Sequence, residues 1–193
     1  MRTFESKQPD LGRILILGPL FLALAWSLGA IVASNDVLIT RAAFFLSGIV
    51  IVSLVLFWLV ARSDPEGGTL FAIMLVSLTL KLLAMAFRFN AGLLADAYVY
   101  DDSGVAYARI LASGRWPEGI QYGGTDVIRL LTGLVYFVTG ETIYGISILW
   151  AWFGLLGMLF FYKAFITAFP GGHRRIYMYL IFLYPSMQLW TSS

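Results

Sequence analysis

Three carboxylates stand within seven residues in the run Asp96-Ala-Tyr-Val-Tyr-Asp-Asp102, just beyond a long apolar segment. We therefore expect Asp96, Asp101 and Asp102 to lie near the point where the chain leaves a membrane. A carboxyl group that is partly desolvated there has a raised pKa and can act as a general base toward a sugar hydroxyl. The same oxygens can instead hold a divalent cation, and Tyr100 stands beside them as a candidate substrate contact. The alternative is a solvated loop in which an aspartate caps a helix.

A second set of candidates is cationic and consists of Lys81, Arg88 and Arg129. Lys81 and Arg88 are seven residues apart, so on a helix they share one face. A charge inside a spanning helix costs about 2.5–3.5 kcal/mol on insertion scales and is therefore a functional hypothesis by default. A lipid phosphate or pyrophosphate is the fitting partner. The alternatives are that Lys81 snorkels outward or pairs with an acid, and that Arg129 pairs locally with Asp126.

The composition excludes several other kinds of chemistry. Cysteine is absent, so disulfides, Cys-zinc sites and thiol catalysis are ruled out. The single histidine, His173, argues against a His-based metal centre and against a Ser-His triad. The formal net charge of +2 is too small to indicate a nucleic-acid partner. Any chemistry must rest on carboxylates, Lys or Arg, and Tyr.

The elements that must position these residues are apolar runs. Hydrophobic residues make up 60% of the 193 residues and charged residues only 12%, against roughly 25% charged in typical globular chains. Runs of about 20 apolar residues cross a hydrocarbon core of ~30 Å. The sequence thus predicts one all-α domain over residues 1–193, a polytopic transmembrane helix bundle in the lipid bilayer. We expect about five spans, over residues 14–33, 42–61, 69–87, 142–162 and 176–190.

The remaining segments are expected to connect these spans. Residues 89–126 form an outer loop that holds an amphipathic helix, capped by Asp102 or Ser103 and ending at Gly114 as its C′ residue. Residues 127–140 contain too short an apolar run to span, so they form a re-entrant or interfacial segment. The positive-inside rule then puts the N-terminus and the Arg174-Arg175 loop in the cytoplasm, and the acidic loop outside the cell membrane.

The run from Asp96 to Gly114 resembles the first large outer loop of GT-C type polyprenyl-phosphate-sugar glycosyltransferases. In that superfamily an aspartate leaves the membrane ahead of a tyrosine and a small-residue helix. The ending Pro185-Ser with Trp190-Thr-Ser-Ser193 is similar to an element of related bacterial membrane transferases. Two departures stand out: two apolar runs, rather than one, precede the helix that leads into the loop, and relatives continue beyond this ending. We therefore expect the N-terminal part of a longer protein.

The resemblance implies a membrane enzyme that moves a sugar from a polyprenyl-phosphate donor to an acceptor hydroxyl on the extracytoplasmic side. Asp96 matches the loop aspartate best, and its implied role is a base or an acceptor-orienting group. Asp101 occupies a place where some relatives carry histidine. The alternative function is a non-catalytic membrane subunit, derived from such an enzyme, that packs against other subunits of a larger complex.

Overall fold

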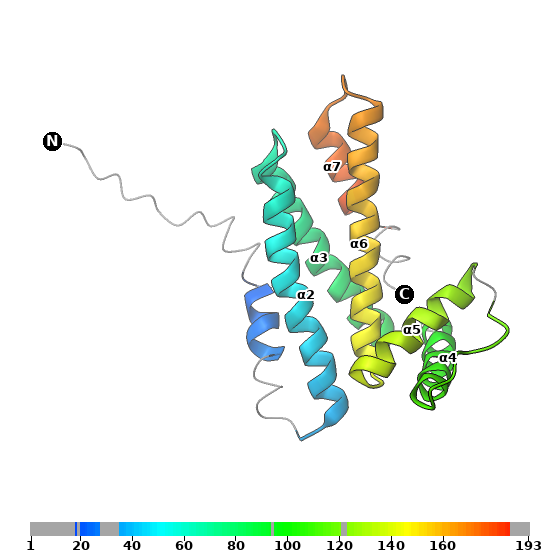
Figure 1. The fold of residues 1–193 in the computed structure, drawn as a ribbon. Coiled ribbons are helices and arrows are strands. Elements are labelled where there is room, and N and C mark those ends of the chain that lie inside the picture. The colour runs from blue at the N-terminus through cyan, green and yellow to red at the C-terminus, as the bar shows by residue number, and fades with distance from the viewer. Residues whose placement is uncertain (1–17, 19, 28–34, 94, 121–122, 186–193) are drawn as a thin grey trace.

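The structure is a computed structural model, and it describes residues 18, 20–27, 35–93, 95–120 and 123–185. Within these ranges the regular structure is entirely helical, and no strand is present, which confirms the all-α class (Figure 1). Residues 20–27 form a short helical piece. The helices that follow are α2 (Val37–Ala61), α3 (Gly67–Asn90), α4 (Ala95–Ala112), α5 (Thr125–Thr139), α6 (Ile143–Ala168) and α7 (Arg174–Leu183).

Three of these helices, α2, α3 and α6, are long and apolar enough to cross a membrane. Each has 24 to 26 residues, which at 1.5 Å per residue gives about 36–39 Å, more than the ~30 Å hydrocarbon core. They lie side by side, with α7 against α3 and α6 (Figure 1). Their shared core includes Phe57, Leu70, Leu155 and Tyr162, all without exposed surface.

The expected five spans and the re-entrant segment remain predictions. The runs 14–33 and 176–190 lie partly outside the described residues, and α7 has only ten residues. Helix α5 covers most of the segment 127–140 with 15 residues, about 22 Å, which is too short to cross the hydrocarbon core directly. In Figure 1, α5 lies obliquely beside the lower end of α6 and is paired with α4.

A buried carboxylate joins the two hairpins of the bundle. Asp64 lies in the turn between α2 and α3, and its side chain is 1% exposed. It accepts bonds from Lys163 Nζ at 3.1 Å and from the Tyr162 hydroxyl at 3.5 Å, both on α6. Arg174 Nη1, at the start of α7, is 3.7 Å from the same oxygen. This carboxylate thus connects the α2–α3 turn with both α6 and α7.

Helix α4 begins earlier than the sequence indicated. Its first residue is Ala95, so the expected N-cap at Asp102 or Ser103 is wrong, and both residues lie inside the helix. The preceding residues contain no helix breaker after Gly92, which has φ +69° and follows the end of α3. The C-terminal prediction is confirmed: Gly114 has φ +75°. Its N–H donates to the carbonyl oxygen of Leu111, and the Arg115 N–H donates to the carbonyl oxygen of Ile110. These two hydrogen bonds are the pattern of a Schellman motif.

Glycines set how closely α4 and α5 approach. A Cβ at Gly104 on α4 would lie 2.4 Å from Cγ2 of Thr132 on α5. A Cβ at Gly133 on α5 would lie 2.6 Å from Cβ of Tyr107 and 3.2 Å from the carbonyl oxygen of Gly104. Small residues let two helix backbones meet at such short distances. The pair α4–α5 is therefore tightly packed, with Gly104 and Gly133 facing the partner helix.

The Asp64 cluster gives a first prediction. Asp64→Asn should lower the free energy of unfolding by about 1.5–3 kcal/mol, because it removes charge-assisted bonds to a buried acceptor. The exposed pair of Glu66 with Arg175, at 2.9 Å, supplies the control, and Glu66→Gln should cost only about 0.2–1 kcal/mol. Reversible unfolding in mixed detergent micelles measures both variants. Equal losses would show that burial of Asp64 contributes nothing.

The α4–α5 contact gives a second prediction. Gly104→Ala and Gly133→Ala should each lower the free energy of unfolding by about 1–3 kcal/mol, because the added methyl group overlaps the partner helix. Gly157→Ala on α6 is the matched control, since nothing lies within 4 Å of its Cβ position. That control should be neutral or stabilising by up to about 1 kcal/mol. The same micelle unfolding assay decides, and three indistinguishable variants would contradict the close approach.

Candidate functional site

Asp101 is the carboxylate with the most distinctive surroundings among the predicted acidic residues. It projects from α4 and accepts a hydrogen bond from the hydroxyl of Tyr136 on α5, a side chain only 3% exposed. Burial raises the pKa of the Asp101 carboxyl, and repulsion from Asp102 and Glu141 raises it further, while the Tyr136 hydrogen bond opposes the rise. Burial, with the bond to Asp101, also raises the pKa of Tyr136, which therefore stays a proton donor at neutral pH.

Two adjoining hollows lie beside Asp101, and together we call them the charged pocket. The first has a volume of about 480 Å³ and is lined by Asp101, Asp102, Arg109 and Glu141, among others. The second has a volume of about 380 Å³, shares Arg109 and Glu141 with the first, and adds Arg41 and Tyr136. The charged pocket thus brings together α4, the α5–α6 turn, and the start of α2.

Arg41 fastens this turn to α2. Its Nη1 donates to the carbonyl oxygen of Glu141 at 3.0 Å. A Cβ at Gly140 would lie 2.3 Å from the guanidinium carbon of Arg41, and Gly140 has φ +80°. Only glycine combines that conformation with that contact. The turn between α5 and α6 therefore depends on two features. Gly140 lets the backbone turn close to Arg41, and the Arg41 guanidinium bonds the turn to α2.

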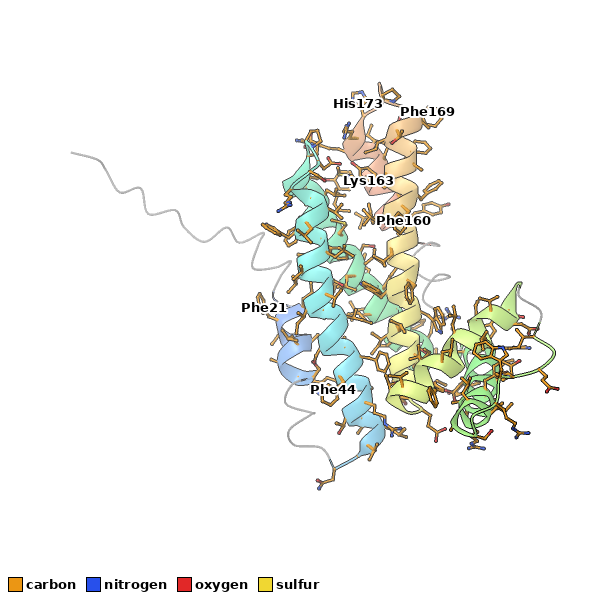
Figure 2. The ribbon with its side chains drawn as sticks, in the orientation of Figure 1. Phe21, Phe44, Phe160, Lys163, Phe169 and His173 are labelled. Atoms are coloured by element: carbon orange, nitrogen blue, oxygen red, sulfur yellow. The ribbon has the colours of Figure 1, made fainter. Side chains whose placement is uncertain are left out.

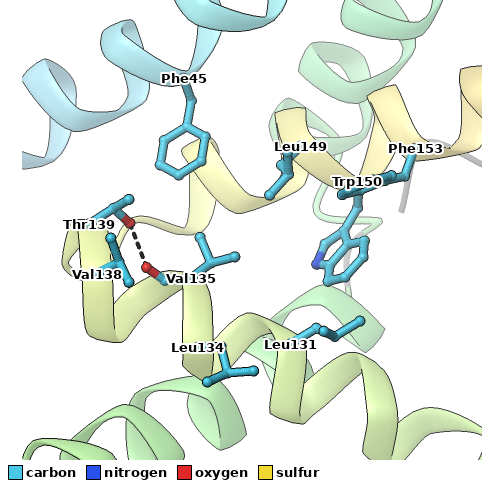
Figure 3. A pocket seen from close by; sticks show the side chains of 9 residues that line it. All are labelled: Phe45, Leu131, Leu134, Val135, Val138, Thr139, Leu149, Trp150 and Phe153. Carbon is cyan, nitrogen blue, oxygen red and sulfur yellow. Dashed lines mark hydrogen bonds between the residues drawn. The ribbon is translucent and has the colours of Figure 1, made fainter.

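An apolar groove lies between α2, α5 and α6, with a volume of about 700 Å³ (Figure 3). Its walls are hydrophobic side chains such as Phe45 of α2, Val135 of α5 and Phe153 of α6. In Figure 3 the Trp150 ring reaches from α6 toward α5, where its Nε1 donates to Thr132 at 3.3 Å. The groove ends at Thr139, next to the turn that borders the charged pocket. An extended hydrocarbon chain matches this lining.

The structure places the other predicted acidic-loop residues as follows. Asp102 is exposed and lines the charged pocket. Asp96 lies in the first turn of α4, and its side chain is outside the described residues. Tyr100 is half-buried on α4 and does not line either hollow. Over the part of the chain that the structure describes, no three carboxylate or histidine side chains converge as ligands of a metal ion.

The three predicted cations, Lys81, Arg88 and Arg129, have different surroundings in the structure. Lys81 is fully buried in α3, so the alternative that it snorkels outward is wrong. Arg88 donates from Nε and Nη2 to the carbonyl oxygen of Leu93, at 3.3 and 3.0 Å, three residues after the end of the same helix. Arg129 pairs with Asp126 at 3.1 Å, as the local alternative has it. Its Nε is buried without a hydrogen-bond partner among the described residues.

Sequence reasoning missed four functional residues of the charged pocket, which are Arg41, Arg109, Tyr136 and Glu141. Arg41 directly precedes the apolar run 42–61 and looks like an ordinary flanking charge. Glu141 follows Gly140 after a short apolar segment, and nothing in the sequence relates it to residues 40 or 100 positions earlier. The one available signal was the α4 spacing, since Asp101, Asp102, Val105 and Arg109 fall within successive turns of one helix.

The raised pKa of Asp101 gives a third prediction. Because the folded chain binds the proton of this carboxyl more tightly than the unfolded chain, its charged form opposes folding at neutral pH. The contribution of this group to stability is largest below its ordinary pKa of about 4 and is lost as the pH rises through the folded value. The native chain should therefore gain stability relative to Asp101→Asn as the pH falls from 7 to 4.

Thermal unfolding in detergent across this pH range measures the difference between the two chains. Glu118→Gln is the control, because Glu118 is exposed and is not among the groups that shift the Asp101 pKa. A native chain that loses stability relative to Asp101→Asn on acidification would contradict the direction of the shift.

Three comparisons, with protein families, with curated proteins and with solved structures, find no significant match to this chain. What the chain does must therefore be argued from the charged pocket, the apolar groove and their place on a membrane bundle.

Proposed function

We propose that the chain is a membrane glycosyltransferase of the GT-C type, which transfers a sugar from a polyprenyl-phosphate donor to an acceptor hydroxyl. One observation carries the proposal: a desolvated carboxyl, Asp101, lies in a charged pocket separated by a single helix from an apolar groove. A lipid-linked sugar has the same two parts, a hydrocarbon chain and a polar head. The proposed enzyme is a multi-pass protein of the cell membrane with its N-terminus in the cytoplasm.

In the proposed reaction the acceptor hydroxyl oxygen forms a bond to the anomeric carbon of the donor sugar. The bond between that carbon and the phosphate oxygen breaks, and polyprenyl phosphate leaves with its electron pair. The hydroxyl proton passes to the Asp101 carboxylate, whose raised pKa makes it a better proton acceptor near neutral pH than an ordinary aspartate. The Tyr136 hydroxyl orients this carboxylate by donating to one of its oxygens.

The rest of the pocket supports donor binding. Arg41 and Arg109 both line it, and guanidinium groups suit phosphate oxygens because their N–H donors form a planar fork. The apolar groove suits the isoprenoid chain. The proposed side of the membrane is supported by the arrangement of the helices, since the Arg174-Arg175 turn and the α4–α5 pair lie at opposite ends of the bundle (Figure 1). With the basic turn in the cytoplasm, the charged pocket faces outward.

Sugar transfer from a radiolabelled polyprenyl-phosphate donor in proteoliposomes tests the proposal. Asp101→Asn should lower the rate about 10²–10⁴-fold, the usual contribution of a general base. Tyr136→Phe should lower it less and shift the acidic limb of the pH profile, because the bond that opposes the raised Asp101 pKa is removed. Asp96→Asn tests the aspartate that matches the family loop best.

Asp126→Asn is the control, because this residue pairs locally with Arg129 and does not line the charged pocket. It should leave the rate unchanged. Unaltered transfer by both Asp101→Asn and Asp96→Asn would overturn the catalytic assignment. A native chain that binds no lipid-linked sugar, and that purifies with a stoichiometric membrane partner, would favour the non-catalytic subunit instead.

A further inference from the structure

The end of the bundle formed by the α2–α3 and α6–α7 turns carries more positive than negative charge. Four cations and two carboxylates gather there among the described residues of the two turns and the adjoining helix ends, and we call this surface the basic end. Its cations are Arg62, Lys163, Arg174 and Arg175, and its carboxylates are Asp64 and Glu66. Two positive charges therefore remain after pairing.

The carboxylates hold the cations in place without covering them. The Asp64 side chain is 1% exposed, whereas those of Lys163 and Arg174 are 35% and 36% exposed. Arg175 is 64% exposed and bonds Glu66 through Nε and Nη2. Since an arginine has five N–H donors, these contacts leave further donors at the surface. The cations are thus fixed in position and still accessible to an anion.

In a bilayer that α6 crosses, the length of this helix brings the basic end to the level of the lipid phosphates. Helix α6 has 26 residues, about 39 Å, so it extends beyond a hydrocarbon core of ~30 Å. Figure 2 shows Lys163, Phe169 and His173 together at this end of the molecule. Exposed aromatic side chains stand on or next to the same three helices within a few residues of these cations in the sequence, and aromatic residues of this kind favour the membrane interface. They are Trp58, Phe161, Phe169 and Tyr179, each at least half exposed.

Arg62 combines a cation with an exposed aromatic ring in a single contact. Its guanidinium carbon lies 5.4 Å from the centre of the Trp58 ring, on the last turns of α2. A cation seated on an interfacial tryptophan is held at headgroup depth, because the ring favours the boundary between hydrocarbon and water. The apolar surface below it, such as Val55, is exposed and suits acyl chains.

We propose that the basic end binds the phosphate headgroups of anionic phospholipids, with acyl chains lying along the exposed sides of α2 and α6. Phosphate diesters supply the negative charge that the two unbalanced cations require. The exposed aromatic side chains and the depth of the cations favour a lipid headgroup over a free anion, because a free anion gains nothing from either. This site stands at the opposite end of the bundle from the charged pocket and does not depend on the proposed function.

Native mass spectrometry of the full chain in a neutral detergent tests the proposal. The purified chain is mixed with phosphatidylglycerol or phosphatidylcholine of the same acyl length. Retention of phosphatidylglycerol should exceed that of phosphatidylcholine, and Arg62→Gln/Arg174→Gln should reduce the excess roughly tenfold or more, because two interfacial cations are lost. Arg115 is an exposed arginine three residues after α4, which lies at the opposite end of the bundle (Figure 1). Arg115→Gln should therefore leave the excess unchanged.

Three outcomes would overturn the inference. The first is equal retention of the two lipids, and the second is an equal loss of the phosphatidylglycerol excess in Arg115→Gln. The third is full displacement of phosphatidylglycerol by inorganic phosphate at the same concentration as the lipid. The last result would show that the acyl chains and the exposed aromatic side chains play no part. Circular dichroism checks that the double variant folds. If it does not, Arg62→Gln alone, with Arg62→Lys as the charge-restoring variant, carries the test, because Arg62 makes no ion pair among the described contacts.

Discussion

The Asp64 carboxylate is the contact on which the arrangement of the spanning helices depends. It is one charge, almost without exposed surface, shared by a lysine of α6 and an arginine of α7. A buried carboxylate is costly to desolvate and becomes favourable only when several donors compensate it. Here the donors come from the second hairpin, so the first hairpin is fully compensated only when the second is docked. The contact therefore favours one mutual placement of α2–α3 and α6–α7 over other placements with similar apolar packing.

The candidate site depends on this placement indirectly. Helices α4 and α5 pack chiefly on each other, and Gly104 and Gly133 set their separation. Arg41 joins the pair to α2 through the α5–α6 turn. The position of Asp101 relative to the bundle thus results from two steps, the close α4–α5 contact and the fastening of the turn after α5. A change at either step moves the carboxyl without touching it.

Much of the fold follows from the sequence because bilayers accept few structures. Backbone groups in hydrocarbon must bond within the chain, so long apolar runs become helices, and the runs 42–61, 69–87 and 142–162 correspond to α2, α3 and α6. The end of α4 at Gly114 was also predictable, because a left-handed residue there suits glycine. The start of α4 at Ala95 was not predictable, because Asp96, Asp101, Asp102 and Ser103 are all residue types that favour an N-cap, yet all of them lie inside the helix.

The site was only partly predictable for a different reason. Asp101 and Asp102 could be predicted because they are adjacent in the sequence. Arg41 and Glu141 meet because two helices and a turn converge across 100 residues, and no local pattern encodes that distance. Lys81 and Arg88 share a face by their spacing, yet Lys81 is buried in the core and Arg88 donates to the carbonyl oxygen of Leu93, beyond the end of the helix. The spacing of two residues on a helix thus indicated that they share a face, but it did not indicate how deeply each side chain is buried.

Helix α5 has one further consequence for any molecule that occupies both hollows. One side of the helix carries Tyr136 toward the charged pocket, and another carries Leu131 and Val135 toward the apolar groove. A helix with its side chains is roughly 10–12 Å wide. Such a molecule cannot pass through that width, so it must be an amphiphile that bends around the C-terminal end of α5, where Thr139 of the apolar groove adjoins the Gly140-Glu141 turn of the charged pocket. The turn after α5 is thus the point at which the head and the tail of such a molecule would meet.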